Sequence, residues 1–329
     1  MVMSKRGIEE FFSGIDSFLA DRLLFRAETF ELLSRVESRF NDVPDFNLAY
    51  RGKDGWLFLG KNQSIAKLMG SVQPKRPSKL IEDFKSILPE IDGIQTFFIL
   101  GPDKSSVYPE YLPDFVRPVP VRYVQAYLDQ LENTEAVEVV DPTEVLGQNK
   151  KQGLLYYRTD THWNLPGASL AVETFIDGLN RSIGRDERII LPDYGFLPLP
   201  PVYGDLVLVG GFINVQLQPG DNFSFAWKNV RPDLEVKEAD GKTWSLAAGD
   251  PAPNLEPGKW FTVYNPQSVS GKKVWFFRDS FGVSMGPLIH GAFREVRHVH
   301  VNNLKSARKM IQTLEKPDLI IVECVERNI

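Results

Sequence analysis

Ser280 is the residue whose type and position best fit covalent chemistry. It follows the apolar run 274–277 and lies in the sequence Arg-Asp-Ser-Phe-Gly. In an open α/β sheet, ligands gather at the carboxyl ends of the strands. A serine that starts a helix there exposes its hydroxyl, and the first backbone N–H groups of the helix can stabilise an oxyanion. The alternative is that Asp279 or Ser280 only caps the helix.

His162 and Asp160 form the second candidate pair, in the segment Arg-Thr-Asp-Thr-His-Trp. In an extended segment, residues two apart project to the same side. The Asp160 carboxylate can then fix the tautomer of the imidazole and leave its other nitrogen free to act as a base. The alternative is a structural histidine bonded to a local aspartate. A serine at a strand end and an Asp-x-His loop are together the parts of a serine acyl-transfer site.

The other three histidines fit this chemistry less well. His290 lies ten residues beyond Ser280, whereas His298 and His300 alternate with valine in a predicted strand and share one face. His162, His298 and His300 could in principle bind Zn²⁺, but a His-x-His pair is a weak signal without a recognised third ligand. The sequence therefore predicts no metal and no other cofactor.

The elements that must position these residues alternate between strand and helix, which is typical of a doubly wound α/β sheet. Apolar runs predict strands, and amphipathic periodicity predicts helices. The predicted strands are 96–100, 136–140, 274–277, 296–301 and 319–325, and the predicted helices are 78–91, 121–131, a helix opening at 164–167, and 306–314. The glycine-flanked turn at 52–55 predicts a hairpin.

The predicted domain organisation has two parts. Residues 1–48 form an N-terminal helical segment, and residues 49–329 form the catalytic domain. Within that domain, residues from about 191 to 270 are rich in proline and glycine. We interpret them as an insertion of loops and short strands rather than as a separate globular unit.

Composition narrows the function classes. The formal net charge is −5, so nothing indicates a nucleic-acid surface, although a local basic groove for an anionic polymer remains compatible with it. The single cysteine, Cys324, rules out an intramolecular disulfide and a cysteine metal cluster. No apolar run is long enough to span a bilayer, and no signal peptide is visible; either the protein is cytoplasmic or a leader precedes this numbering.

Four short motifs, in order, resemble the AlgX/AlgJ-type SGNH hydrolase-like polysaccharide (alginate) O-acetyltransferases. The resemblance covers almost the whole chain from about residue 10. The motifs are Gly-Lys-Asp-Gly-Trp-Leu-Phe at 52–58, Pro-Asp-Lys at 102–104 with Tyr-Pro-Glu-Tyr-Leu-Pro at 108–113, Thr-Asp-Thr-His-Trp at 159–163, and Arg-Asp-Ser-Phe at 278–281.

This resemblance implies a triad of Asp160, His162 and Ser280. It also implies an SGNH hydrolase-like (flavodoxin-like) three-layer α/β sandwich with a mostly parallel sheet, in permuted order because the serine comes late. Arg278 stands where plain SGNH motifs have glycine, and no separate asparagine motif for an oxyanion hole is identifiable. Lys104 and Tyr108 are expected near the site as substrate-binding residues.

The function that the resemblance implies is transfer of an acetyl group through an acetyl-serine to hydroxyls of an exopolysaccharide such as alginate, in the periplasm. A membrane-bound O-acyltransferase partner would supply the acetyl group. An SGNH carbohydrate acetylesterase would use the same triad with water as the acceptor. A non-catalytic polysaccharide-binding assembly subunit is the third hypothesis, and it differs in not needing Ser280.

Overall fold

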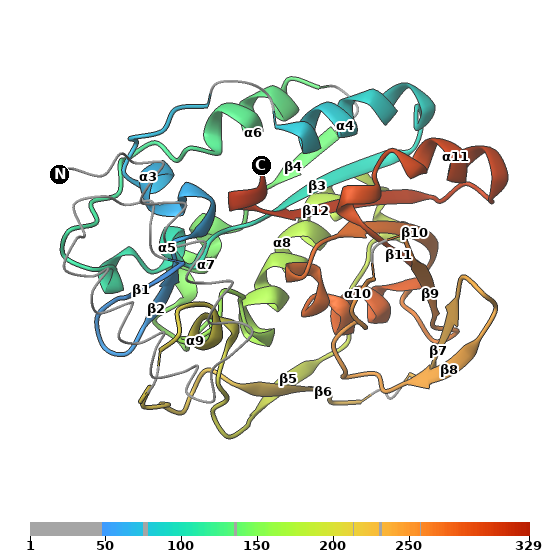
Figure 1. Cartoon of the computed structure of the whole chain (residues 1–329). Helices are drawn as coiled ribbons and strands as arrows, with labels where there is room; N and C mark the ends of the chain where they lie inside the picture. The colour runs from blue at the N-terminus through green and yellow to red at the C-terminus, as the bar shows by residue number, and fades with distance from the viewer. Residues whose placement is uncertain (1–47, 75–77, 135–136, 213, 230–231, 257) are drawn as a thin grey trace, which may run out of the picture.

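The computed structural model describes residues 48–74, 78–134, 137–212, 214–229, 232–256 and 258–329 (Figure 1). The predicted N-terminal helices over residues 1–48 lie outside this range, apart from Leu48. Within the described part of the chain, no helix combines the length and the apolar character needed to cross a bilayer.

A central eight-stranded sheet organises the molecule, in the order β4-β3-β12-β10-β11-β9-β7-β8. The first five of these strands are parallel, and they are the five strands predicted from apolar runs, with slightly different ends. Every residue of β12 is buried, as expected for a parallel strand covered on both faces. Their bounds are β3 (Gln95–Gly101), β4 (Val137–Val140), β10 (Ser270–Arg278), β11 (Phe293–His300) and β12 (Leu319–Val325).

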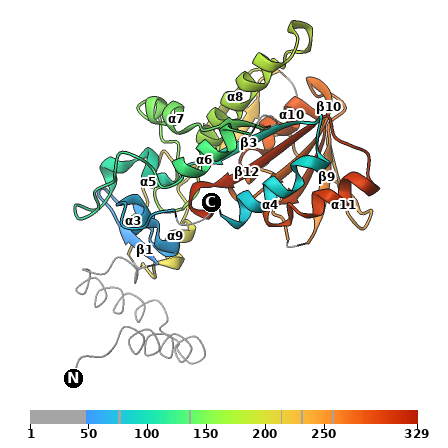
Figure 2. The ribbon, with the colours of Figure 1, turned by 90° about the horizontal axis from the view of Figure 1, so that it is seen from above.

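Helices cover both faces of the parallel part and give three layers (Figures 1 and 2). One core cluster joins the sheet to α8 (Leu165–Ser182) and α10 (Gly286–Ala292), with α5 (Lys104–Val107) and α7 (Thr143–Asn149) at one end. The other joins it to α4 (Lys79–Ile87), α6 (Gln125–Glu132) and α11 (Ser306–Thr313). The predicted three-layer, mostly parallel α/β sandwich is therefore confirmed.

The segment predicted as an insertion contributes both to the sheet and to its surroundings. Strands β7 (Leu234–Glu238), β8 (Thr243–Leu246) and β9 (Trp260–Tyr264) extend the sheet in antiparallel fashion beyond β11. Strands β5 (Tyr194–Pro198) and β6 (Phe223–Trp227) form a separate pair, and α9 (Asp205–Val209) lies between them in the chain. The domain boundary itself stays a prediction.

Local signals set the ends of the elements that lead to the candidate site. The Asn164 side chain accepts a hydrogen bond from Gly167 N at 3.1 Å, so α8 begins three residues after His162. The predicted hairpin is formed by β1 (Ala49–Arg51) and β2 (Leu57–Leu59), and its turn uses positive φ at Asp54 and Gly55. A short helix, α3 (Ser64–Leu68), follows the hairpin.

Candidate active site

Ser280 lies two residues beyond the carboxyl end of β10, the strand that pairs in parallel with β11 on one side and β12 on the other. Its surroundings differ from the α-helix start expected from the sequence: a 3₁₀ turn at Phe281–Val283 follows, and α10 begins only at Gly286. A turn this short directs the chain sharply away from the strand and leaves Ser280 exposed at the end of the sheet.

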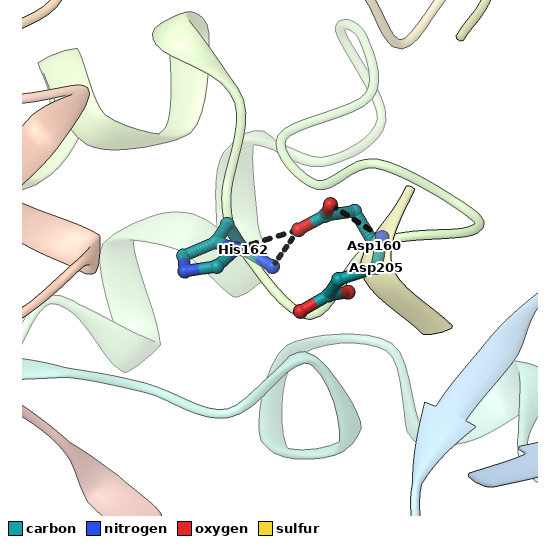
Figure 3. A group of neighbouring side chains, drawn as sticks. All are labelled: Asp160, His162 and Asp205. Atoms are coloured by element: carbon teal, nitrogen blue, oxygen red, sulfur yellow. Dashed lines mark hydrogen bonds and ion pairs between the residues drawn. The ribbon is translucent and has the colours of Figure 1, made fainter. Parts of the chain in front are cut away.

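The structure brings Ser280, His162 and Asp160 together. His162 Nε2 lies 2.8 Å from Ser280 Oγ, and His162 Nδ1 lies 2.6 Å from Asp160 Oδ1. Figure 3 shows Asp160 facing the Nδ1 side of the ring. Because the carboxylate accepts the Nδ1 proton, Nε2 is left as the acceptor for the serine hydroxyl.

The Asp160 carboxylate is held ionised by its hydrogen bonds. Burial alone would raise its pKa, but contacts with the His162 side chain and with the backbone N–H groups of Asp205 and His162 lower the pKa to about 2. The carboxylate therefore remains an acceptor throughout the neutral range.

A tight loop carries the Asp-x-His pair, as expected. Tyr156 and Trp163 face each other in an isolated antiparallel bridge, and Tyr157 N donates to His162 O at 3.3 Å. The indole N–H of Trp163 donates to the Phe281 carbonyl at 2.9 Å. This last bond ties the histidine loop directly to the serine turn.

Asp279 is structural in this arrangement. One carboxylate oxygen accepts the Phe281 N–H at 2.8 Å, and the other accepts the Val325 N–H at 2.9 Å, which fixes the serine turn to β12. Glu323 of β12 accepts the Asp279 N–H at 3.2 Å. Asp279 therefore takes the capping role by accepting the backbone N–H groups of Phe281 and Val325. The Ser280 side chain is left free to face the pocket.

Lys104 and Tyr108, the predicted substrate-binding residues, are both buried in this structure. Substrate binding by either residue stays a prediction. The Lys104 ammonium donates to three carbonyls of the histidine loop, those of Tyr157, Arg158 and Asp160, at 3.0, 3.0 and 2.7 Å. Burial lowers the pKa of Lys104 to about 7, and the neighbouring carboxylates oppose that shift. Three acceptors match the three protons of the charged amine.

The Tyr108 hydroxyl accepts the Leu155 N–H at 3.0 Å. Lys104 and Tyr108 therefore support the loop that presents Asp160 and His162, from the side away from the pocket.

Asp205, at the start of α9, is a site neighbour that the sequence analysis missed. Its carboxylate, that of Asp160 and the His162 ring offer atoms that all lie within 4.8 Å of one another, a spacing that could hold a metal ion (Figure 3). Each group already makes hydrogen bonds: the Asp160 carboxylate with the His162 ring, and the Asp205 carboxylate with Thr161. The only signal in the sequence is the Gly-Asp pair at 204–205, which is too common to identify it.

The zinc alternative built on His162, His298 and His300 does not fit the geometry. His298 is buried and accepts from Arg278 Nε at 2.9 Å, while His300 Nδ1 accepts the Asn302 N–H at 3.2 Å. His162 instead lies against Ser280. Their nitrogen atoms are thus committed to three different local contacts.

A pocket of about 350 Å³ opens beside the triad. The inserted segment forms part of its wall. Its lining residues are Tyr157, Asp160, His162, Val202, Gly204, Pro251, Asn254, Ser280, Val283 and Ser284. Arg278 holds the 251–254 part of this wall by donating to the Pro253 carbonyl, and Ala252 N donates to Val283 O at 2.9 Å.

The fold and this constellation define the class: an SGNH hydrolase-like domain with a serine, a histidine and an aspartate at the carboxyl end of its sheet. Residues 49–187, which include Asp160 and His162, match the family model described as "SGNH hydrolase-like domain, acetyltransferase AlgX".

Two curated relatives are both named "Probable alginate O-acetylase AlgJ". The chain is 28% identical over 174 residues to the Pseudomonas putida protein, covering 47% of this chain and 43% of the relative. It is 26% identical over 183 residues to the Pseudomonas aeruginosa protein, covering 47% and 42%. The matched part thus spans less than half the length of these relatives. The predicted resemblance to the AlgX/AlgJ-type family is confirmed.

Solved structures share the fold over most of the chain. Bacillus cereus PatB1 matches with a TM-score of 0.58 at 17% identity, covering 86% of this chain and 97% of that one. The O-acetyltransferase domain of Pseudomonas putida AlgJ matches with a TM-score of 0.51 at 17% identity, covering 85% and 91%.

Proposed function

We propose that this protein is a serine-dependent O-acetyltransferase that moves an acetyl group through acetyl-Ser280 onto hydroxyls of an exopolysaccharide such as alginate. The observation that carries the proposal is the continuous hydrogen-bonded line from Ser280 Oγ through the His162 ring to Asp160. The names of the AlgJ relatives support the substrate class.

In the first step, His162 Nε2 takes the Ser280 proton as Oγ attacks the carbonyl carbon of the acetyl donor. The imidazolium returns that proton to the leaving group when the tetrahedral intermediate collapses to acetyl-Ser280. Asp160 stabilises the imidazolium through its hydrogen bond to Nδ1.

In the second step, a sugar hydroxyl gives its proton to His162 Nε2 and attacks the acetyl carbon. Collapse of this intermediate forms the sugar ester and breaks the bond to Ser280 Oγ, which recovers the proton. Among the lining residues, Tyr157, Asn254 and Ser284 carry side-chain donors that can assist the oxyanion or the acceptor.

The esterase alternative has one observation in its favour. Ser280 is exposed, so water can reach an acetyl-serine as readily as a sugar can. The donor and the compartment also belong to the proposal: by family likeness, a membrane-bound O-acyltransferase partner supplies the acetyl group and the reaction takes place in the periplasm.

The test is to incubate the protein with 4-nitrophenyl acetate, with and without an alginate oligomer, and to measure both nitrophenolate release and acetylated sugar. A transferase gives acetylated oligomer at the expense of free acetate. An esterase gives only acetate, whatever the acceptor concentration. A non-catalytic subunit gives the same low turnover in wild type and Ser280→Ala.

A further inference from the structure

Asp205 reaches the triad from a part of the chain that the catalytic motifs do not include. It is the first residue of α9 and lies beside Asp160 and His162 (Figure 3), and the Gly204 backbone before it lies directly against Asp160. A Cβ at position 204 would come within 2.4 Å of Asp160 Cβ and within 2.5 Å of its backbone nitrogen. Only glycine lets the 204–205 segment approach the histidine loop this closely.

Asp205 makes three hydrogen bonds to the Asp-x-His loop. Its backbone N–H donates to Asp160 Oδ2 at 2.9 Å. Its carboxylate accepts the Thr161 N–H and the Thr161 hydroxyl, each at 2.7 Å. The triad aspartate and the residue beside the triad histidine are thus both fixed by one side chain and its own backbone.

The Thr161 hydroxyl also links Asp205 to the imidazole. Since this hydroxyl donates its proton to Asp205, its lone pairs face His162 Nδ1, which lies 3.2 Å away. The Nδ1–H therefore has two acceptors, Asp160 directly and the Thr161 oxygen, and the latter is polarised by a second carboxylate.

Other charged groups surround Asp205. Asp160 and Asp221 add negative charge to this region, while Lys104 and Arg327 carry positive charge near Asp205. Lys104 is occupied by the three loop carbonyls, and Arg327 is paired with Asp103. Of these charges, only those of Asp160 and Asp205 are connected to the imidazole through hydrogen bonds.

We propose that Asp205 is a positioning residue of the triad, which orients His162 and Asp160 through Thr161 and stabilises the imidazolium through a two-bond relay. This inference rests on the proposed function in taking Ser280, His162 and Asp160 as the reacting groups. It gives the inserted segment a defined role, because α9 supplies a second carboxylate in addition to that of Asp160 in the Asp-x-His motif.

The experiment measures sulfonylation of Ser280 by phenylmethylsulfonyl fluoride, followed by intact-protein mass spectrometry from pH 5 to 9. In this reaction the Ser280 Oγ–S bond forms, the S–F bond breaks, fluoride leaves and His162 accepts the proton. It needs neither an acetyl donor nor a sugar. Labelling of wild type without any acetyl transfer would thus count against the proposed function and still leave this inference testable.

For Asp205→Asn, we expect labelling about tenfold slower at neutral pH, because a hydrogen bond to a charged group is lost. The low-pH limb of the rate profile should move to lower pH, because the carboxylate that stabilises the imidazolium through the Thr161 hydroxyl is gone. Thr161→Val should shift the limb in the same direction, since it breaks the relay and leaves both carboxylates in place.

Asp221→Asn is the matched control. Asp221 is likewise an acid that braces this loop, buried and accepting the Arg158 N–H at 2.9 Å, but it makes no bond to Thr161 or to the triad. It should leave the position of the limb unchanged. A slower rate with an unshifted limb in both Asp205→Asn and Thr161→Val would overturn the relay. If Asp205→Asn does not fold, the Thr161→Val profile alone decides.

Discussion

The molecule contains two histidine sites with opposite surroundings. His162 lies in an open pocket, with a serine hydroxyl on one ring nitrogen and a carboxylate on the other. His290 and His298 are fully buried and contact each other through Nε2 atoms 2.9 Å apart, and Arg278 lies beyond them. The same side chain therefore faces a negative partner in one site and a positive partner in the other.

The hydrogen-bond directions in the buried pair follow from Arg278. Arg278 Nε can only donate, so His298 Nδ1 accepts and His298 Nε2–H donates to His290. Burial first, and then the charge of Arg278, lower the pKa of His290 to about 3 and that of His298 well below its usual range. These neutral rings hold Arg278 in place, whereas His162 is arranged to gain and lose a proton.

His162→Gln should show the largest effect on activity, and it should distinguish the open histidine site from the buried one most clearly. Removing the base should reduce acetyl transfer by about four orders of magnitude or more. The free energy of unfolding should change by no more than about 1 kcal/mol, because the side chain is partly exposed. Steady-state kinetics and urea unfolding measure the two quantities. Retention of most of the activity would contradict the assignment of His162 as the base.

His298→Leu should give the reverse pattern. The substitution leaves the buried Arg278 Nε without its acceptor, so unfolding should become easier by about 3 kcal/mol. Activity per folded molecule should stay within about tenfold of wild type. Loss of activity at unchanged stability would show that the buried pair takes part in the chemistry, and the two histidine sites would then not differ in function.

Lys104→Met tests whether the buried lysine supports the loop or binds substrate. Three carbonyls would lose their donor, so we expect a loss of about 3 kcal/mol in stability and a lower kcat. KM for the acceptor should be nearly unchanged, because the ammonium faces the loop rather than the pocket. A raised KM with normal stability and kcat would restore the substrate-binding hypothesis.

Glu323→Gln should have the smallest effect, and it should stabilise the protein where the two preceding substitutions destabilise it. Burial, followed by the charge of Asp279, raises the pKa of Glu323 well above its ordinary 4.5. In the wild type, stability is therefore lost as the pH rises above 4.5, since the unfolded chain ionises and the folded one does not. The Gln variant should match wild type near pH 4 and exceed it by about 1 to 2 kcal/mol at pH 7. Urea unfolding at both values measures this, and an equal difference at the two values would exclude a neutral Glu323.

The sequence predicted the parts of the site that depend on local pattern. Apolar runs located the parallel strands, and the Asp-x-His and Asp-Ser motifs located three side chains that the fold brings together. What the sequence does not show depends on distant contacts. Lys104 and Tyr108 were placed near the site, but no motif shows that their polar ends bond to the backbone of the histidine loop and of Leu155.

Asp205 could not be found for a related reason. It lies in a segment rich in proline and glycine, and it meets Asp160 only because the chain returns from β5 to the histidine loop. The sequence predicts β7, β8 and β9 only as short inserted strands and does not place them in the sheet. Strands of four or five residues carry too few apolar positions to show which strand they pair with.

The central claim is that Ser280 carries the acetyl group during transfer. Rapid quenching after mixing with 4-nitrophenyl acetate, followed by peptide mass spectrometry, measures it directly. The account predicts acetylation of the peptide containing Ser280, with a lifetime that shortens as the concentration of the sugar acceptor rises. Transfer to the sugar with no acetyl on Ser280 at any time would contradict it.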